Sequence, residues 1–308
     1  MIVYHYCSLD TFYAIGINKT IRLSDITKSN DSMEIMWVTK FIKDIFMNTF
    51  DNEKTEYFKK NYPSSVFEEL INHYQIDFFD ETKRIYSYYV CCFSEIGDVL
   101  SQWRGYADDA KGVAIGFDGN LLSSIGYNAK YDPINTQALY FDKVEYSDRA
   151  HKQIVKKASE QLIKDLKPIA KKYTIDCVDK IRQESMKPFN SCFLKLFNKA
   201  IFIKNPFFKE EKEYRICQWL DNRNNEPQVE SIILNSGIHF DKFSFQNRGG
   251  KLVSYFDLNF SKSSDEFVKE IVIGPKAKIT KSDVKRFLFN NGINIDDSKI
   301  LYSNGTYR

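Results

Sequence analysis

Three polar clusters interrupt apolar, strand-like stretches of this 308-residue chain and carry the side chains best suited to chemistry. One of them, Lys209 to Arg215, has Glu211 and Glu213 two positions apart, just before the apolar run Ile216 to Leu220. Side chains two positions apart on a strand share a face, so we expect both carboxylates on one face and Lys212 on the other. A carboxylate there could stabilise a developing oxocarbenium ion and orient an attacking group. A solvated strand end is the alternative explanation of these charges.

A second cluster, Ser94 to Tyr106, forms the connection between two apolar stretches. Trp103 and Tyr106 offer planar rings for stacking, Arg104 offers a guanidinium group for a phosphate, and Gly105 would let backbone approach a ligand closely. This composition favours one wall of a ligand site. The alternative is a tight loop in which Trp103 covers the core.

The remaining cluster is Tyr4-His5-Tyr6, on the first predicted strand. The chain has only four histidines. An imidazole at this position could donate to a ribose hydroxyl or a phosphate of a bound ligand. A packed histidine between aromatic neighbours is the alternative.

Two other functions fit the same residues. A metal-dependent nuclease could use Glu210-Glu211-Lys212 together with Asp31 or Asp98 as a magnesium site. A non-catalytic nucleic-acid-binding module could stack its aromatic residues on bases and hold phosphates with a Lys-rich helical stretch. The glycine-rich loops that usually bind phosphates do not follow any predicted strand.

The composition restricts the class of protein. Apolar residues make up 43% and charged residues 28%, and the net charge of +3 excludes a strongly basic nucleic-acid coat. The six cysteines include no pair with the spacing of a zinc or redox motif, which favours free thiols in a reducing compartment. With no signal peptide and no apolar run of about 20 residues, we expect a soluble, cytoplasmic protein without membrane contact.

The elements expected to position these clusters indicate an α+β fold, because strands occur in groups on either side of a helical block rather than in regular alternation with helices. Apolar periodicity predicts a long amphipathic helical stretch over about 148–200, broken near Pro168 and Pro188. Strands are predicted near 2–6, 20–26, 85–94, 112–118, 138–147, 212–220, 229–235, 251–260, 270–275 and 299–302, and shorter helices near 9–18, 32–50, 65–74 and 281–294.

The three clusters together resemble a bacterial family, domain of unknown function 2971. The resemblance rests on "YHYCSLDTFYAIGINKTIRLSDITKSNDSMEI", "CFSEIGDVLSQWRGYADDAKGVAIGFD", "FKEEKEYRI" and "IVIGP". It covers essentially the whole chain and is weakest over about 148–200. The "LSQWRGYA" and "GVAIGF" segments are its most specific part.

That family is in turn similar in layout to ADP-ribosyltransferases of the His-Tyr-Glu kind. The resemblance implies a single ADP-ribosyltransferase-like domain over 1–308, with mixed or antiparallel sheets around a cleft and helical insertions at about 32–75 and 148–200. NAD would be the substrate, and the acceptor would be a nucleic acid, a protein or water. Such enzymes include toxins of phage-defence and toxin–antitoxin systems, so an antitoxin protein is an expected partner.

Carried over to this chain, the resemblance makes Glu213 the catalytic carboxylate, with Glu211 as the alternative. His5, with its neighbour Tyr6, would contact the NAD ribose, and Ser94 would match the middle-strand serine. The remaining cofactor contacts would come from Trp103 or Tyr106 on the nicotinamide ring and Arg104 at the pyrophosphate. The position of the middle tyrosine stays open, since Tyr86, Tyr88 and Tyr89 compete with Tyr106. The segment 148–200 would offer a surface for an acceptor or partner.

Overall fold

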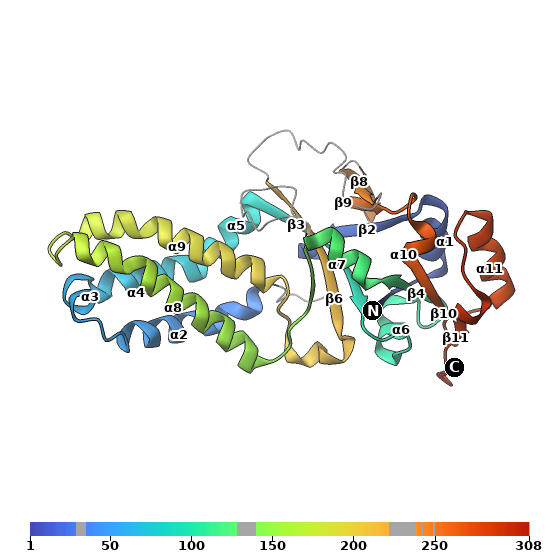
Figure 1. Ribbon diagram of the computed structural model, residues 1–308, viewed down its shortest axis with the longest axis horizontal. Coiled ribbons are helices and arrows are strands. Elements are labelled where there is room, and N and C mark those ends of the chain that lie inside the picture. Colours follow the sequence, from blue (N-terminus) through green and yellow to red (C-terminus); the bar gives the residue numbers. More distant parts are fainter. Residues whose placement is uncertain (29–34, 128–139, 222–237, 242, 249, 308) are drawn as a thin grey trace. The chain divides into compact units, whose positions relative to one another are not determined.

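The computed structural model describes residues 1–28, 35–127, 140–221, 238–241, 243–248 and 250–307, which form two compact units (Figure 1). The sheet unit comprises Met1–Ser29, Ser87–Val144 and Lys209–Arg308. The helical unit comprises Asn30–Tyr86 and Glu145–Phe208. Both predicted insertions, about 32–75 and 148–200, fall within the two stretches of the helical unit, and their description as insertions in one domain stays a prediction.

The sheet unit contains one mixed sheet. Its described strands are β1 Ile2–Cys7, β2 Thr20–Asp25, β3 Tyr86–Ser94, β4 Val113–Asp118, β5 Tyr140–Lys143, β6 Glu213–Asp221, β7 His239–Phe240, β8 Ser244–Arg248, β9 Lys251–Asn259, β10 Val268–Ile273 and β11 Ile300–Tyr302. The main path runs β11-β10-β4-β1-β3-β2-β9-β7, with β6 beside β3 and β5 beside β6. Most neighbours are antiparallel, but β10 and β11 are parallel. The chain is therefore a mixed α/β protein. The strand predicted near 229–235 lies outside the described residues.

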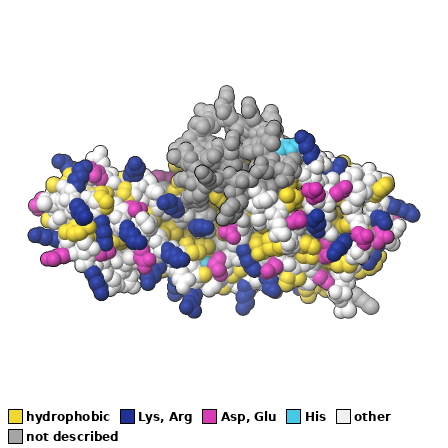
Figure 2. Space-filling model, in the orientation of Figure 1, with side chains coloured by type: hydrophobic (Ala, Val, Ile, Leu, Met, Phe, Trp, Pro, Cys, Tyr) yellow, Lys and Arg dark blue, Asp and Glu magenta, His cyan; other side chains and the backbone are white. Residues whose placement is uncertain are grey.

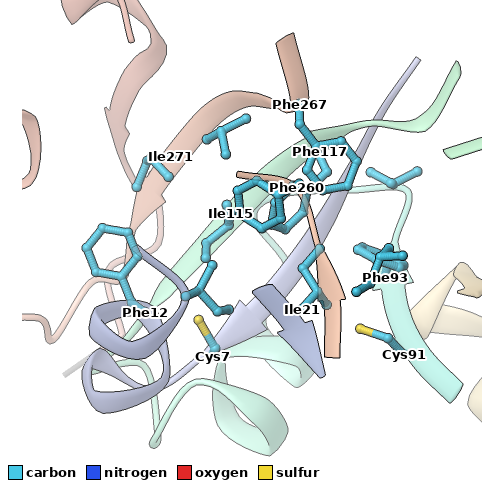
Figure 3. Packing of buried hydrophobic residues seen from close by; sticks show 14 of the residues in the cluster. Cys7, Phe12, Ile21, Cys91, Phe93, Ile115, Phe117, Phe260, Phe267 and Ile271 are labelled. Atoms are coloured by element: carbon cyan, nitrogen blue, oxygen red, sulfur yellow. The ribbon is translucent and has the colours of Figure 1, made fainter. Parts of the chain in front are cut away.

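One face of this sheet carries the large core, a cluster of buried apolar side chains (Figure 3). Val3 and Cys7 of β1 point to this face, together with Phe93 of β3 and Ile115 of β4. The alternation of side chains along each strand places every second residue here. The helices that contribute to the large core are α1 Leu9–Asn18, α7 Gly119–Tyr127, α10 Ser264–Phe267 and α11 Lys281–Asn290.

The opposite face carries the small core, which consists of Tyr6, Trp103, Ala107, Ala110, Ala114 and Val272. Trp103 reaches it from helix α6, Leu100–Tyr106. The sequence predicted only a loop between Ser94 and the next strand. The structure corrects this prediction, because one short helix turns Gln102 and Trp103 inward while the polar residues around them stay outside.

The helical unit is a bundle with an aromatic core. Its main helices are α2 Ile42–Asp51, α3 Glu56–Asn61, α4 Ser64–His73, α5 Phe79–Ile85, α8 Asp148–Lys172 and α9 Val178–Ala200, with a 3-10 helix η2 Met36–Phe41 and a π-helical turn η3 Tyr74–Phe78. Helix α8 packs on α2, α3 and α9, and α4 packs on α2 and α9. Rings such as Phe50, Phe67 and Phe189 fill the interior. None of the helices in the described ranges is both long and apolar enough to span a bilayer.

The two prolines of this unit do not interrupt its long helices, contrary to the prediction. Pro168 lies inside α8 and Pro188 inside α9. A proline removes the hydrogen bond to the carbonyl group four residues earlier. For Pro168 that residue is Lys164, and both are exposed, so water can satisfy the freed carbonyl group. The break between the helices comes instead after Lys172.

Candidate active site

Ser94, the last residue of β3, connects two segments that are distant in sequence. Its side chain is 1% exposed. The Ser94 hydroxyl donates to the backbone carbonyl oxygen of Glu211 at 2.8 Å and accepts from the backbone N–H of Ile96 at 3.2 Å. The backbone N–H of Glu95 also donates to the carbonyl oxygen of Lys212 at 2.9 Å. These bonds fix the segment before β6 against the end of β3.

Trp103 is a core residue rather than a stacking surface. It is 1% exposed, and its ring meets the Tyr6 ring edge to face at a centroid distance of 4.7 Å. Its indole N–H donates to Oδ1 of Asp98 at 2.6 Å. A ring enclosed in this way has no face left for nicotinamide, so the predicted stacking role of Trp103 does not fit the structure.

Tyr6 likewise stabilises the connection between β3 and α6. It is 5% exposed, and its hydroxyl donates to the carbonyl oxygen of Ile96 at 2.8 Å and accepts from the backbone N–H of Val99 at 3.0 Å. The aromatic residues of this region therefore anchor the loop. This structural role explains why Trp103 stands on a connection between two strands.

The Asp98 carboxylate accepts several hydrogen bonds in the same connection. Besides the Trp103 indole, its carboxylate accepts from the Ser303 hydroxyl at 2.6 Å and the Asn304 backbone N–H at 2.7 Å. These three hydrogen bonds use most of the lone pairs of the carboxylate, which disfavours Asp98 as a magnesium ligand. Asp31, the other candidate ligand, lies outside the described residues. Among the described side chains, no group of three or more His, Cys, Asp or Glu could hold a metal ion.

Arg104 and Tyr106 face outward from α6. The Arg104 guanidinium lies 6.0 Å from the centroid of the Tyr307 ring. Tyr106 is 42% exposed, and its hydroxyl donates to Oε1 of Glu211 at 3.2 Å. A methyl group added at Gly105 would meet no atom within 4 Å. Within the described structure, no close contact requires glycine at this position.

Glu211 and Glu213 occupy different environments, which corrects the prediction that strand alternation relates them. Glu211 ends the 3-10 helix η4, Pro206–Glu211, whereas Glu213 begins β6. Lys212 between them has a φ of 43°, in the left-handed region, so the chain is not an extended strand here. Glu211 is half-buried and Glu213 is 4% exposed.

The Glu213 carboxylate is paired with Arg215. The guanidinium donates from Nε to Oε1 at 2.6 Å and from Nη2 to Oε2 at 3.1 Å. Arg215 is 1% exposed. Residues two apart on β6 share a face, which brings these two side chains together. The sequence analysis gave Arg215 no role, although the spacing Glu-x-Arg on an apolar strand is a signal for such a pair.

Cys92 lies next to this ion pair. Its side chain is exposed, yet burial raises the pKa of its thiol well above the usual value, and the adjacent Glu213 carboxylate adds to the rise. Cys92 and Ser94 share a face of β3, opposite Cys91 and Phe93.

His5 lies on the other face of the sheet. Its Nδ1 is 3.0 Å from the carbonyl oxygen of Cys92 and 3.7 Å from Sγ of Cys91, and its ring meets Phe93 edge to face. Burial lowers the pKa of the His5 imidazole, and the hydrogen bond to Cys92 partly opposes this effect. Cys91 and Phe93 belong to the large core, as does Ile216 of β6.

The structure therefore brings together only part of the predicted site. Ser94, Tyr106 and Glu211 are joined by hydrogen bonds on the small-core side of the sheet. Glu213 shares that side, because it alternates with Ile216 of the large core. His5 points to the opposite side and does not join them.

The comparisons with known proteins give one match. A family model described as a protein of unknown function, DUF2971, matches residues 102–216. This range includes Trp103, Tyr106 and Glu211, but not the first strand. No curated protein matches the chain, and no solved structure does. For residues 102–216, the match supports the resemblance to the DUF2971 family that the sequence motifs indicate.

Proposed function

We propose that the chain is an NAD-dependent ADP-ribosyltransferase with an ADP-ribosyltransferase-like fold, and that Glu211 is its catalytic carboxylate. The observation that carries this proposal is the contact of Ser94, Tyr106 and Glu211, three site residues from three separate segments. The acceptor is a nucleic acid or a protein. A toxin role, with an antitoxin protein as partner, belongs to the same proposal.

Glu211 suits the role better than Glu213. The Glu213 carboxylate is buried and already has the Arg215 guanidinium as its counter-charge. Glu211 is half-buried, and Tyr106 donates to one of its oxygens from an exposed position. A positioned carboxylate stabilises the positive charge that develops in a transition state.

In the proposed reaction, the bond between the ribose C1 and the nicotinamide nitrogen breaks, and nicotinamide leaves with the electron pair. Glu211 stabilises the resulting oxocarbenium-like ribose. A nucleophile of the acceptor then forms a bond to C1 and loses a proton. The exposed ring of Tyr106 would stack on the nicotinamide, and its hydroxyl would orient Glu211.

The test is nicotinamide release from NAD, measured by chromatography with protein, RNA, DNA or water as acceptor. Glu211→Gln should lower the rate by about 10²-fold or more, because it keeps the size of the side chain but removes the charge. Glu210→Gln is the matched control, since its exposed carboxylate is one position earlier. An inactive parent protein with all four acceptors, or a Glu211→Gln variant with the parental rate, would overturn the proposal.

A further inference from the structure

A basic pocket lies on the helical unit, between α2 and α8. Its volume is about 510 Å³, and its described lining consists of Ile45, Arg149, Lys152, Gln153 and Lys156. The four residues from α8 are spaced at i, i+3, i+4 and i+7, so they share one face of the helix and extend over about 10 Å along it. All four are exposed. The pocket thus has three cationic side chains, an amide and one apolar residue.

The charge of this surface is not balanced locally. Helix α8 carries eight Lys and Arg against three Asp and Glu. Lys156 has a carboxylate partner in Glu160 at 3.9 Å, in an exposed pair of the kind that contributes little. Within the ranges that the structure covers, no carboxylate pairs with Arg149 or Lys152. Two of the three lining cations therefore remain available to an anionic ligand.

Lys40 extends the positive surface beyond α8. Its ammonium group lies 4.7 Å from the centroid of the Phe41 ring, and that of Lys152 lies 5.6 Å from the same centroid. Lys40 also has Asp148 at 3.7 Å, but both side chains are exposed and the pair is weak. Figure 2 shows Lys and Arg side chains, in dark blue, over the part of the helical unit that faces the viewer.

We propose that this pocket binds the phosphodiester backbone of a nucleic acid. Lysine and arginine side chains recognise phosphates by charge, and the amide of Gln153 can add a hydrogen bond to a phosphate oxygen. Its volume lies within the range of roughly 300–1,000 Å³ that is usual for ligand sites. Because none of the described lining residues is aromatic, we expect contacts to the backbone rather than stacking on bases. Binding is therefore expected to depend on salt and little on sequence.

The experiment measures fluorescence anisotropy of a labelled single-stranded oligonucleotide with the full chain, in the absence of NAD. The test variant is Arg149→Glu/Lys152→Glu/Lys156→Glu. The matched control is Lys180→Glu/Lys187→Glu/Lys195→Glu, which makes the same charge change at exposed positions of α9. The test variant should bind about tenfold more weakly or worse, and its plot of log affinity against log salt should be shallower by about 2 between about 50 and 200 mM. The control should keep most of the affinity and slope.

Three results would overturn the proposal. The parent chain could fail to bind the oligonucleotide, both triple variants could lose affinity equally, or AMP and inorganic phosphate could compete as well as unlabelled oligonucleotide at equal phosphate concentration. The last result would assign the pocket to a small phosphate compound. A neutral variant, Arg149→Gln/Lys152→Gln/Lys156→Gln, repeats the test should the charge reversal reduce the melting temperature. Because the readout is binding without NAD, it is independent of the proposed transferase activity.

Discussion

Glu213 and Arg215 form a bidentate ion pair at the start of β6, and both residues are buried. Each charge has the other as a close partner in a place with little water. Removing one member of such a pair leaves a buried charge without compensation, which costs far more than loss of an exposed pair. The pair therefore makes Glu213 a structural residue of β6.

We expect Glu213→Gln to destabilise the protein by about 3 kcal/mol or more. Urea unfolding followed by circular dichroism checks this, with Glu210→Gln as an exposed control expected to stay within about 0.5 kcal/mol of the parent. The double variant Glu213→Gln/Arg215→Met should be less destabilised than the two single changes added together, because it removes the unpaired charge. A single variant within about 1 kcal/mol of the parent would contradict the structural role.

We expect Trp103→Phe to act on stability rather than on NAD binding. The change removes the indole N–H that donates to the charged Asp98 carboxylate. It also removes part of a buried ring. Together these should lower the free energy of unfolding by about 2 kcal/mol or more. Tyr13→Phe, at a ring 60% exposed, is the control. A Trp103→Phe variant with parental stability and weaker NAD binding in calorimetry would instead restore the stacking role.

The sequence predicted most of the local structure near the site because local patterns determine it. The strand Ile2–Cys7 and the helix Leu9–Asn18 were expected almost residue for residue, since an apolar β-branched run and a serine N-cap mark them. The helix over Leu100–Tyr106 was missed. Its seven residues are too few for a helical period to stand out, and its position depends on Trp103 packing against Tyr6 across the chain.

The candidate site was predicted as a set of residues but not as an arrangement. Alternation predicts which side chains share a face only within one continuous strand. The left-handed φ of Lys212 interrupts the strand between Glu211 and Glu213, so the two side chains do not share a face by alternation. The face of the sheet that His5 occupies depends on the register of β1 between its neighbours, which is set by long-range pairing. No local pattern carries that information.

The His5 imidazole should make stability depend on pH below neutrality. The carbonyl oxygen of Cys92 can only accept, so Nδ1 carries the proton of the neutral ring. Burial lowers the pKa of His5 in the folded protein, whereas the unfolded chain takes up the proton near pH 6.5. Below about pH 6.5 the unfolded state therefore binds more protons, and the His5 contribution to stability is lost as the pH falls.

His5→Asn checks this, because its amide can replace the Nδ1 donor without titrating. The melting temperature of the parent minus that of His5→Asn should be larger at about pH 8 than at about pH 5.5. His73→Asn, which changes an exposed imidazole in α4, controls for general effects of pH. A difference that is constant with pH would show that the folded protein protonates His5 as readily as the unfolded chain does.

Tyr106 should affect catalysis in two separable ways under the proposed function. Tyr106→Phe keeps the exposed ring but removes the hydroxyl that donates to Glu211 at 3.2 Å. One lost hydrogen bond of about 1 kcal/mol should lower kcat by about five- to tenfold and leave KM for NAD within about twofold.

Tyr106→Ala also removes the ring, and the loss of stacking on the nicotinamide should raise KM by about tenfold. Tyr13→Ala is the control, since it removes another exposed tyrosine ring, from α1. Steady-state kinetics of nicotinamide release measures both constants. If Tyr106→Ala keeps the parental kcat and KM, Tyr106 is not part of the site, and the role of Glu211 must be decided by its own variant.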